Sequence, residues 1–300
     1  LEVSVSTSPL LGLGAGLEQL VTYPYGCTEQ TTSRLVPLLS LRDLARALGV
    51  ALPPDLAQAS REAVVRVLGN QQKDGGFGLW PGSTESSPWL STYATWGLDE
   101  ARRHGVPVDE AALGRAHEHL AGLLLAWGRG PKERAAAPFA LDVLAGAEGA
   151  DVAGLRTVAA QLFDAREGMP LFSRALLLSA MSKLGAPSGD RAALATELAA
   201  SVVLDGSVAR VPAAGDEWAS YLDSSVRGGA MVLRALLSAQ PDHPLAQPLA
   251  LGLVADRNGT GQPPACPGLC GARHQRPPRL PSAARRRSRR CRRRLRKTPG

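Results

Sequence analysis

The stretch ALLLSAMSKLGA at residues 175–186 indicates the fold class of this chain more directly than any other segment. It carries Ala and Leu on more than one helical face, and GGAMVLRALLSA at residues 228–239 has the same character. Such segments suit inner helices that are covered on two sides better than they suit a surface bundle. Outward from them, apolar residues recur at three- and four-residue intervals, and Gly, Pro or Asp bounds each segment. The sequence therefore predicts an all-α fold.

The expected helices form pairs joined by short loops, which favours a closed α/α toroid, with an open solenoid as the other arrangement of such pairs. Two segments alternate like strands instead: residues 1–8, assigned to a preceding domain, and residues 207–212, which read as a hairpin arm. The helices are predicted at residues 10–21, 28–48, 54–69, 88–104, 109–127, 133–147, 151–164, 171–185, 189–203, 220–239 and 244–255.

The net charge of +7 would ordinarily point to nucleic acid or another acidic partner. Residues 271–300, however, hold twelve Arg and one Lys without any acidic residue. The rest of the chain keeps 21 of the 34 basic residues and all 27 acidic ones, so its net charge is −6. We therefore expect no nucleic-acid partner. No window approaches eighteen uninterrupted apolar residues and the chain opens without a targeting pattern, so we also expect no membrane segment in this chain.

The end of the chain differs in composition from the rest. Residues 263–300 contain seven Pro, twelve Arg and three Cys, but no acidic or aromatic residue, so they cannot build a core. We predict a disordered Arg- and Pro-rich tail. The spacing of Cys266, Cys270, His274 and Cys291 fits no usual zinc pattern. The sequence therefore predicts neither a metal site nor a cofactor.

One cysteine, Cys27, occurs in the first 265 residues, within YPYGCTEQTTSR at residues 23–34. Three residues apart on a helical turn, Cys27 and Gln30 face the same side. Attack of the thiolate on the carboxamide carbon, with loss of ammonia, would leave an internal thioester. Gly26 would permit backbone angles that a Cβ forbids. The alternative for a bare Cys-x-x-Gln pair is a buried, inert cysteine that caps a core helix.

The longer stretch favours the reactive interpretation, because it resembles the thioester region of the α2-macroglobulin and complement family, particularly its bacterial members. The resemblance begins with GCTEQ at residues 26–30 and continues through QQKDGGFGLWPG at 71–82 and ESSPWLSTY at 85–93. Further similarity runs through residues 218–236 and residues 256–261. Residues 9–262 are therefore assigned to a thioester domain.

The resemblance implies a single-turnover covalent trap, an endopeptidase inhibitor rather than a turnover enzyme. In this family a protease cuts a bait segment elsewhere in a longer chain, and the captured protein then attacks the thioester. Cys27 would supply the sulfur and leave as thiolate, and Gln30 would supply the acyl carbon. Gly26 and Glu29 would have supporting roles. The implied partners are target proteases and neighbouring macroglobulin domains of the full-length chain.

Two tyrosines before the motif and the cellular location complete this interpretation. Tyr23 and Tyr25 could shield the ester from water, and packing of both rings in the core is the alternative. The resemblance implies an extracytoplasmic protein of a bacterium, in the periplasm or cell envelope. The bias toward Arg over Lys is consistent with a GC-rich genome.

Complement members also use a His, about a hundred residues beyond the thioester Cys, to favour hydroxyl targets. This chain departs from that pattern, because residues 127–134 contain no His. His117 and His119 precede that loop, but two residues apart on a helix they diverge by about 200° and cannot face one site. We therefore expect ordinary surface or partly buried histidines and direct transfer of the acyl group to amines.

Two other classes of function stay open on the sequence alone. Gln71 to Gly78 also resembles the repeat in terpene cyclases and prenyltransferases, which share the α/α toroid. The chain lacks their Asp-rich clusters, and Asp99-Glu100 and Asp216-Glu217 are interpreted as solvated helix-end charges. A non-reactive binding toroid is the third interpretation.

The family resemblance stops after residue 262, where family members continue into further helices of the toroid. Arg, Pro, Ala, Gly and Cys are the residues that GC-rich DNA encodes out of frame. We therefore hypothesise that residues 263–300 are a frameshift product, and that the toroid is incomplete at its C-terminal end, as in a fragment. Such a ring would leave apolar helix faces uncovered and the isolated domain prone to aggregation.

Overall fold

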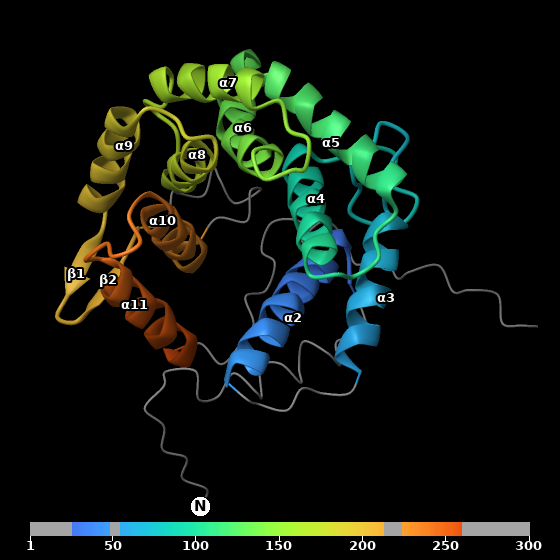
Figure 1. Ribbon diagram of the computed structural model, residues 1–300, viewed down its shortest axis with the longest axis horizontal. Helices are drawn as coiled ribbons and strands as arrows, with labels where there is room; N and C mark the ends of the chain where they lie inside the picture. The colour runs from blue at the N-terminus through green and yellow to red at the C-terminus, as the bar shows by residue number, and fades with distance from the viewer. Residues whose placement is uncertain (1–25, 49–54, 213–223, 260–300) are drawn as a thin grey trace, which may run out of the picture. The chain divides into compact units, whose positions relative to one another are not determined.

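Helices make up most of the part of the chain that the structure describes. The computed structural model describes residues 26–48, 55–212 and 224–259. The predicted all-α class is confirmed (Figure 1). The helix expected at residues 10–21, the strand at residues 1–8 and the tail lie outside the described residues. The helices are α2 (Thr28–Leu48), α3 (Leu56–Leu68), α4 (Pro88–Arg103), α5 (Glu110–Leu125), the short 3₁₀ helix η1 (Trp127–Arg129), α6 (Pro131–Leu144), α7 (Val152–Asp164), α8 (Leu171–Lys183), α9 (Ser188–Ala200), α10 (Ser225–Ala239) and α11 (Ala246–Gly259).

Local side-chain chemistry accounts for several helix starts. The carboxylate of Asp109 accepts a hydrogen bond from the backbone N–H of Ala112 at 2.7 Å, which satisfies a free donor in the first turn of α5. Asp151 caps α7 in the same way, and Ser224 caps α10. The predicted start near Asp109 is thereby confirmed.

The chain forms one small hairpin among the described residues. Strands β1 (Val203–Asp205) and β2 (Val208–Arg210) pair antiparallel, with Val203 opposite Arg210. The hairpin arm predicted at residues 207–212 is confirmed. The helix predicted to reach residue 203 instead ends at Ala200, because the chain turns there into β1.

The helices pack in two rows. In the inner row, α2 contacts α4, α4 contacts α6, α6 contacts α8 and α8 contacts α10 (Figure 1). In the outer row, α3 packs on α2 and α4, α5 on α4 and α6, α7 on α6 and α8, and α9 on α8 and α10. Helix α11 packs on α10 and on β2. This alternation fits the predicted helical pairs, and closure of the rows into a toroid stays a prediction.

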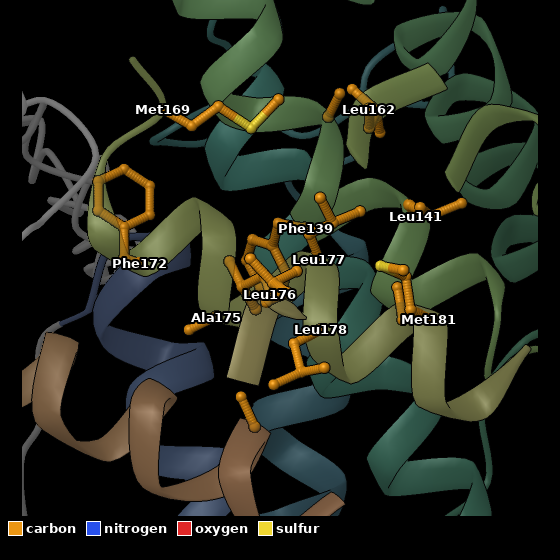
Figure 2. Close-up of a cluster of buried hydrophobic side chains, with 14 of the residues drawn as sticks. Phe139, Leu141, Leu162, Met169, Phe172, Ala175, Leu176, Leu177, Leu178 and Met181 are labelled. Atoms are coloured by element: carbon orange, nitrogen blue, oxygen red, sulfur yellow. The ribbon is translucent and has the colours of Figure 1, made fainter. Parts of the chain in front are cut away.

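Helix α8 is covered on both sides, as its sequence predicts. Leu176, Leu177, Leu178 and Met181 are each at most 2% exposed. Figure 2 shows these side chains pointing to different sides of the helix, toward Phe139 and Leu141 of α6 among others. The largest apolar cluster is therefore built around α8, with α6 and α10 on either side of it.

A buried ionic cluster joins three helices of the inner row. Asp142 of α6 is fully buried. Its carboxylate lies 2.6 Å from Nη2 of Arg234 on α10 and 2.9 Å from Nζ of Lys183 on α8. Burial alone would raise the pKa of Asp142, but the charges of Arg234 and Lys183 together lower it. Asp142 is therefore a charged junction between α6, α8 and α10 inside an otherwise apolar core.

Candidate functional site

Cys27 lies immediately before α2, where the first turn of the helix brings the predicted pair of residues together. The cysteine side chain is 1% exposed, and it belongs to the only cysteine within the described ranges. The backbone N–H of Cys27 donates to Oε1 of Gln30 at 3.3 Å, and the N–H of Thr31 donates to the carbonyl of Cys27 at 2.9 Å. The carboxamide of Gln30 thus folds back over the turn toward Cys27, as in a capping box.

Gly26 lies close to the first turn of α2. A Cβ at this position would lie 2.8 Å from Oγ1 of Thr31. The close approach of the chain to its own first turn therefore favours glycine here.

The second motif, which begins at Gln71, packs directly against the first motif at residues 26–30. Thr28 donates its backbone N–H to the carbonyl of Leu79 at 3.0 Å and its hydroxyl to the carbonyl of Gly78 at 2.6 Å. Nδ2 of Asn70 donates to the same hydroxyl at 2.8 Å. Residues 70–79 therefore hold the start of α2 from one side.

The loop that makes these contacts depends on Gly75. Its φ is +83°, in the left-handed region that favours glycine, and a Cβ would collide with the carbonyl oxygen of Arg115. Next to it, Phe77 is fully buried and its N–H donates to Oγ of Ser91 at 2.8 Å. The loop is thereby wedged between α5 and α4.

Replacing Gly75 with Ala is expected to lower the free energy of unfolding by about 2–4 kcal/mol, through backbone strain and a steric clash together. Gly82→Ala is the matched control, because Gly82 has a φ of +80° but a methyl group added to it would meet no atom within 4 Å. Strain alone should cost that variant about 1 kcal/mol. Urea denaturation of both variants measures the difference, and equal losses would contradict the predicted clash.

Glu29 is held on the other side of the turn. It is 7% exposed, and its Oε1 accepts a hydrogen bond from Oγ of Ser33 at 2.8 Å. Oγ of Ser33 lies 3.0 Å from the hydroxyl of Tyr93 on α4. Nη2 of Arg227 on α10 lies 4.0 Å from Oε1 of Glu29. Side chains from three helices of the inner row thus meet at Glu29.

The two histidines diverge, as the sequence predicts. Nε2 of His117 lies 3.0 Å from the carboxylate of Asp99 on α4, whereas Nδ1 of His119 lies 3.1 Å from the carbonyl of Asp74. Both histidines are partly buried. Asp99 is 1% exposed, so its interpretation as a solvated helix-end charge is wrong. It is buried because α5 covers this end of α4 and supplies His117 as a polar partner.

The remaining predicted site residues fall partly outside the described part of the chain. Tyr23 and Tyr25 lie outside it, as does the pair Asp216-Glu217. Among the described residues, no group of three or more His, Cys, Asp or Glu side chains could hold a metal ion. No helix in the described ranges is both long and apolar enough to span a membrane.

Comparison with known proteins extends these observations. Residues 4–128 match the family model of the A-macroglobulin TED domain, which is the thioester domain. Alpha-2-macroglobulin of Escherichia coli K12 is 29% identical over 250 residues. The crystal structure of Salmonella alpha-2-macroglobulin reacted with methylamine superimposes with a TM-score of 0.68, at 26% identity over 84% of this chain. The chain is therefore similar to bacterial α2-macroglobulins in sequence and in fold.

The chain corresponds to a small part of these α2-macroglobulins. It spans 14% of the length of the Escherichia coli protein and 16% of the Salmonella chain. A shorter Escherichia coli α2-macroglobulin structure, from domain MG7 to the C-terminus, matches with a TM-score of 0.67 at 25% identity, and the match covers 85% of this chain and 40% of that one. The matching part is the helical thioester domain of the family.

Sequence reasoning missed three residues at this site. Ser33 lies in the first motif and Tyr93 in the second, but neither was assigned a role. Arg227 lies within the third stretch of similarity. The position of Ser33 four residues after Glu29 was the one available signal, because such residues are neighbours on a helix. The contacts with Tyr93 and Arg227 depend on helix packing and have no local signature.

Proposed function

We propose that this chain is the thioester domain of a bacterial α2-macroglobulin-like protease inhibitor, in which Cys27 and Gln30 form an internal thioester. The observation that carries the proposal is the return of the Gln30 carboxamide to the backbone of Cys27, 3.3 Å away, at the start of α2. The match of residues 4–128 to the A-macroglobulin TED domain supports it.

The chemistry consists of two balanced steps. In the first, Sγ of Cys27 attacks Cδ of Gln30, a C–S bond forms and the amide nitrogen leaves as ammonia. In the second, an amine attacks the same carbon, the C–S bond breaks, and the sulfur takes up a proton to become the Cys27 thiol. Each molecule reacts once, so the domain acts as a covalent trap. Burial of Cys27 would limit hydrolysis, since water has little access to the bond.

We propose amines, and Lys side chains of attacking proteases above all, as the acceptors. In support, a crystal structure is known of Salmonella alpha-2-macroglobulin reacted with methylamine, which is a primary amine. Residues 127–134, which form η1 and the start of α6, contain no His, while His117 contacts Asp99 and His119 contacts Asp74. The two histidines therefore have separate partners, and neither of these contacts involves Cys27 or Gln30.

The proposal extends to the whole protein. Neighbouring macroglobulin domains would deliver the protease to the thioester, and Tyr23 and Tyr25 would help to shield it. An extracytoplasmic location would suit an inhibitor that meets foreign proteases. The length of the relatives, of which this chain spans 14–16%, supports the assignment to a larger assembly.

Intact mass spectrometry of the 300-residue chain tests the proposal. We expect a species lighter than the sequence mass by one ammonia, which methylamine converts to an adduct while exposing one alkylatable thiol at Cys27. Hydrolysis beforehand would leave Glu in place of Gln30, which peptide mapping detects. A chain of full mass, with Gln30 intact and Cys27 alkylated without methylamine, would instead favour a non-reactive toroid. Preferential incorporation of glycerol over methylamine would overturn the choice of amines.

A further inference from the structure

The first turn of α2 is anchored on two sides by parts of the chain that are distant in sequence. The loop at residues 70–79 holds Thr28, and the cluster of Ser33, Tyr93 and Arg227 holds Glu29. First turns of helices lack part of their backbone hydrogen bonding and fray more readily than helix interiors. Anchoring both residues between Cys27 and Gln30 opposes such fraying.

The direction of the hydrogen bonds in this cluster follows from the number of available protons. Ser33 has one hydroxyl proton and donates it to Glu29, whose carboxylate can only accept. Tyr93 is therefore the donor to Oγ of Ser33, across 3.0 Å. Burial raises the pKa of Tyr93, although the hydrogen bond with Ser33 opposes this effect, so the phenol keeps its proton at neutral pH. A continuous chain of donors leads from Tyr93 through Ser33 to Glu29.

Arg227 completes the cluster from α10. Its guanidinium lies over the ring of Tyr93, 5.7 Å from the centroid, and 4.0 Å from the carboxylate of Glu29. With Glu29 only 7% exposed, a nearby positive charge offsets part of the cost of burying the carboxylate. Arg227 thus links the ring of Tyr93 to the carboxylate of Glu29.

We propose that Ser33, Tyr93 and Arg227 are positioning residues for the thioester, acting through Glu29. This inference rests on the proposed function of Cys27 and Gln30. By fixing Glu29, they fix the helical turn on which the neighbouring Gln30 presents its acyl carbon to Cys27. The rate of an intramolecular attack depends strongly on such alignment. Glu29 would accordingly contribute through its fixed position rather than by contact with the reacting atoms.

The test compares variants of the 300-residue chain by the fraction that carries the thioester and by the rate of methylamine incorporation. Tyr93→Phe and Ser33→Ala are each expected to lower that fraction or rate by roughly tenfold or more. Tyr93→Phe keeps the ring beside Arg227 and removes only the hydroxyl, which reaches Glu29 through Ser33. The double variant should therefore lose no more than Ser33→Ala alone. Ser33→Thr and Arg227→Lys, which keep the hydroxyl and the charge, should retain most of the reactivity that Ser33→Ala and Arg227→Gln lose.

Ser40→Ala is the matched control, because Ser40 lies on the same helix, is exposed, and donates its hydroxyl to the carbonyl of Val36. Thermal unfolding of each variant separates positioning from loss of structure. Losses that are additive between Tyr93→Phe and Ser33→Ala, or that follow the unfolding temperature, would overturn the inference. If the unchanged chain carries the thioester and the Ser33, Tyr93 and Arg227 variants react as fast as Ser40→Ala, the inference is wrong but the proposed function still holds. A wild-type chain without a thioester, of full mass and with Gln30 intact, would overturn the proposed function as well.

Discussion

Replacement of Cys27 with Ala is expected to abolish covalent incorporation of methylamine and to keep the chain at its full sequence mass. The reason is chemical, because Sγ is both the nucleophile that expels ammonia from Gln30 and the leaving group in the acyl transfer. Since the side chain is small and buried, the methyl group of Ala fits the space and the fold should persist. Intact mass and incorporation of labelled methylamine measure the effect.

Gln30→Glu provides a second test of the same pair of residues. This variant keeps the thiol but has no amide nitrogen to release as ammonia, so it should remain at full mass, and Cys27 should be alkylated without methylamine once the chain is unfolded. Gln58→Glu is the matched control, because Gln58 is exposed on α3 and its carboxamide forms hydrogen bonds with Glu62 and Arg61 of the same helix. Loss of ammonia from Cys27→Ala, or methylamine on it, would contradict the assignment.

Replacement of Asp142 with Ala is expected to lower the free energy of unfolding by about 3–5 kcal/mol, which is typical of breaking a buried ion pair on one side. The change leaves Arg234 and Lys183 beside an apolar core without their shared carboxylate. Both cations are partly exposed, with side-chain exposures of 41% and 31%, so water will relieve part of the loss and the lower end of the range is expected.

Urea denaturation compares Asp142→Ala with Asp151→Ala as a control. Asp151 is an exposed aspartate that caps α7 through the N–H of Gly154, and removal of such a cap costs about 1 kcal/mol. A loss for Asp142→Ala no larger than that for Asp151→Ala would show that the buried cluster contributes little.

The same cluster predicts how stability depends on acid. The pKa of Asp142 is lower in the folded chain than in the unfolded chain, because Arg234 and Lys183 outweigh the effect of burial. The folded state therefore binds fewer protons at this site, and its stabilising contribution is complete above the unfolded pKa of about 4. It is lost as the pH falls through the folded pKa. Urea midpoints should accordingly drop less between neutral and acidic pH in Asp142→Asn than in the unchanged chain.

The fold was predictable where a local pattern determines the structure. Apolar residues on several faces predict helix α8 as a covered helix, and Asp109 indicates the start of α5. The end of α9 was misplaced, because Val202 and Val203 continue the apolar composition of the helix while the chain turns into β1. Whether a Val extends a helix or begins a strand depends on its tertiary partners.

The candidate site was predictable to a similar extent. The spacing of Cys27 and Gln30 predicts one side of a helical turn, and in the structure the Gln30 carboxamide accepts a hydrogen bond from the backbone N–H of Cys27. Asp99 and Asp142 could not be placed, because an acidic residue in a helix is read as exposed unless its partners are known. Those partners, His117, Lys183 and Arg234, come from other helices.

The contacts of Thr28 also constrain when the chain could become reactive. Thr28 and Gly78 are 50 residues apart in sequence, and Arg227 lies far beyond both. Contacts between residues so far apart in sequence form late, since closing a long loop costs entropy before packing contacts can compensate for that cost. A nascent chain that has emerged only through α2 would lack every anchor of the turn from other helices. We therefore expect release of ammonia to lag behind helix formation during refolding, so that the thioester forms only after the long-range contacts are in place.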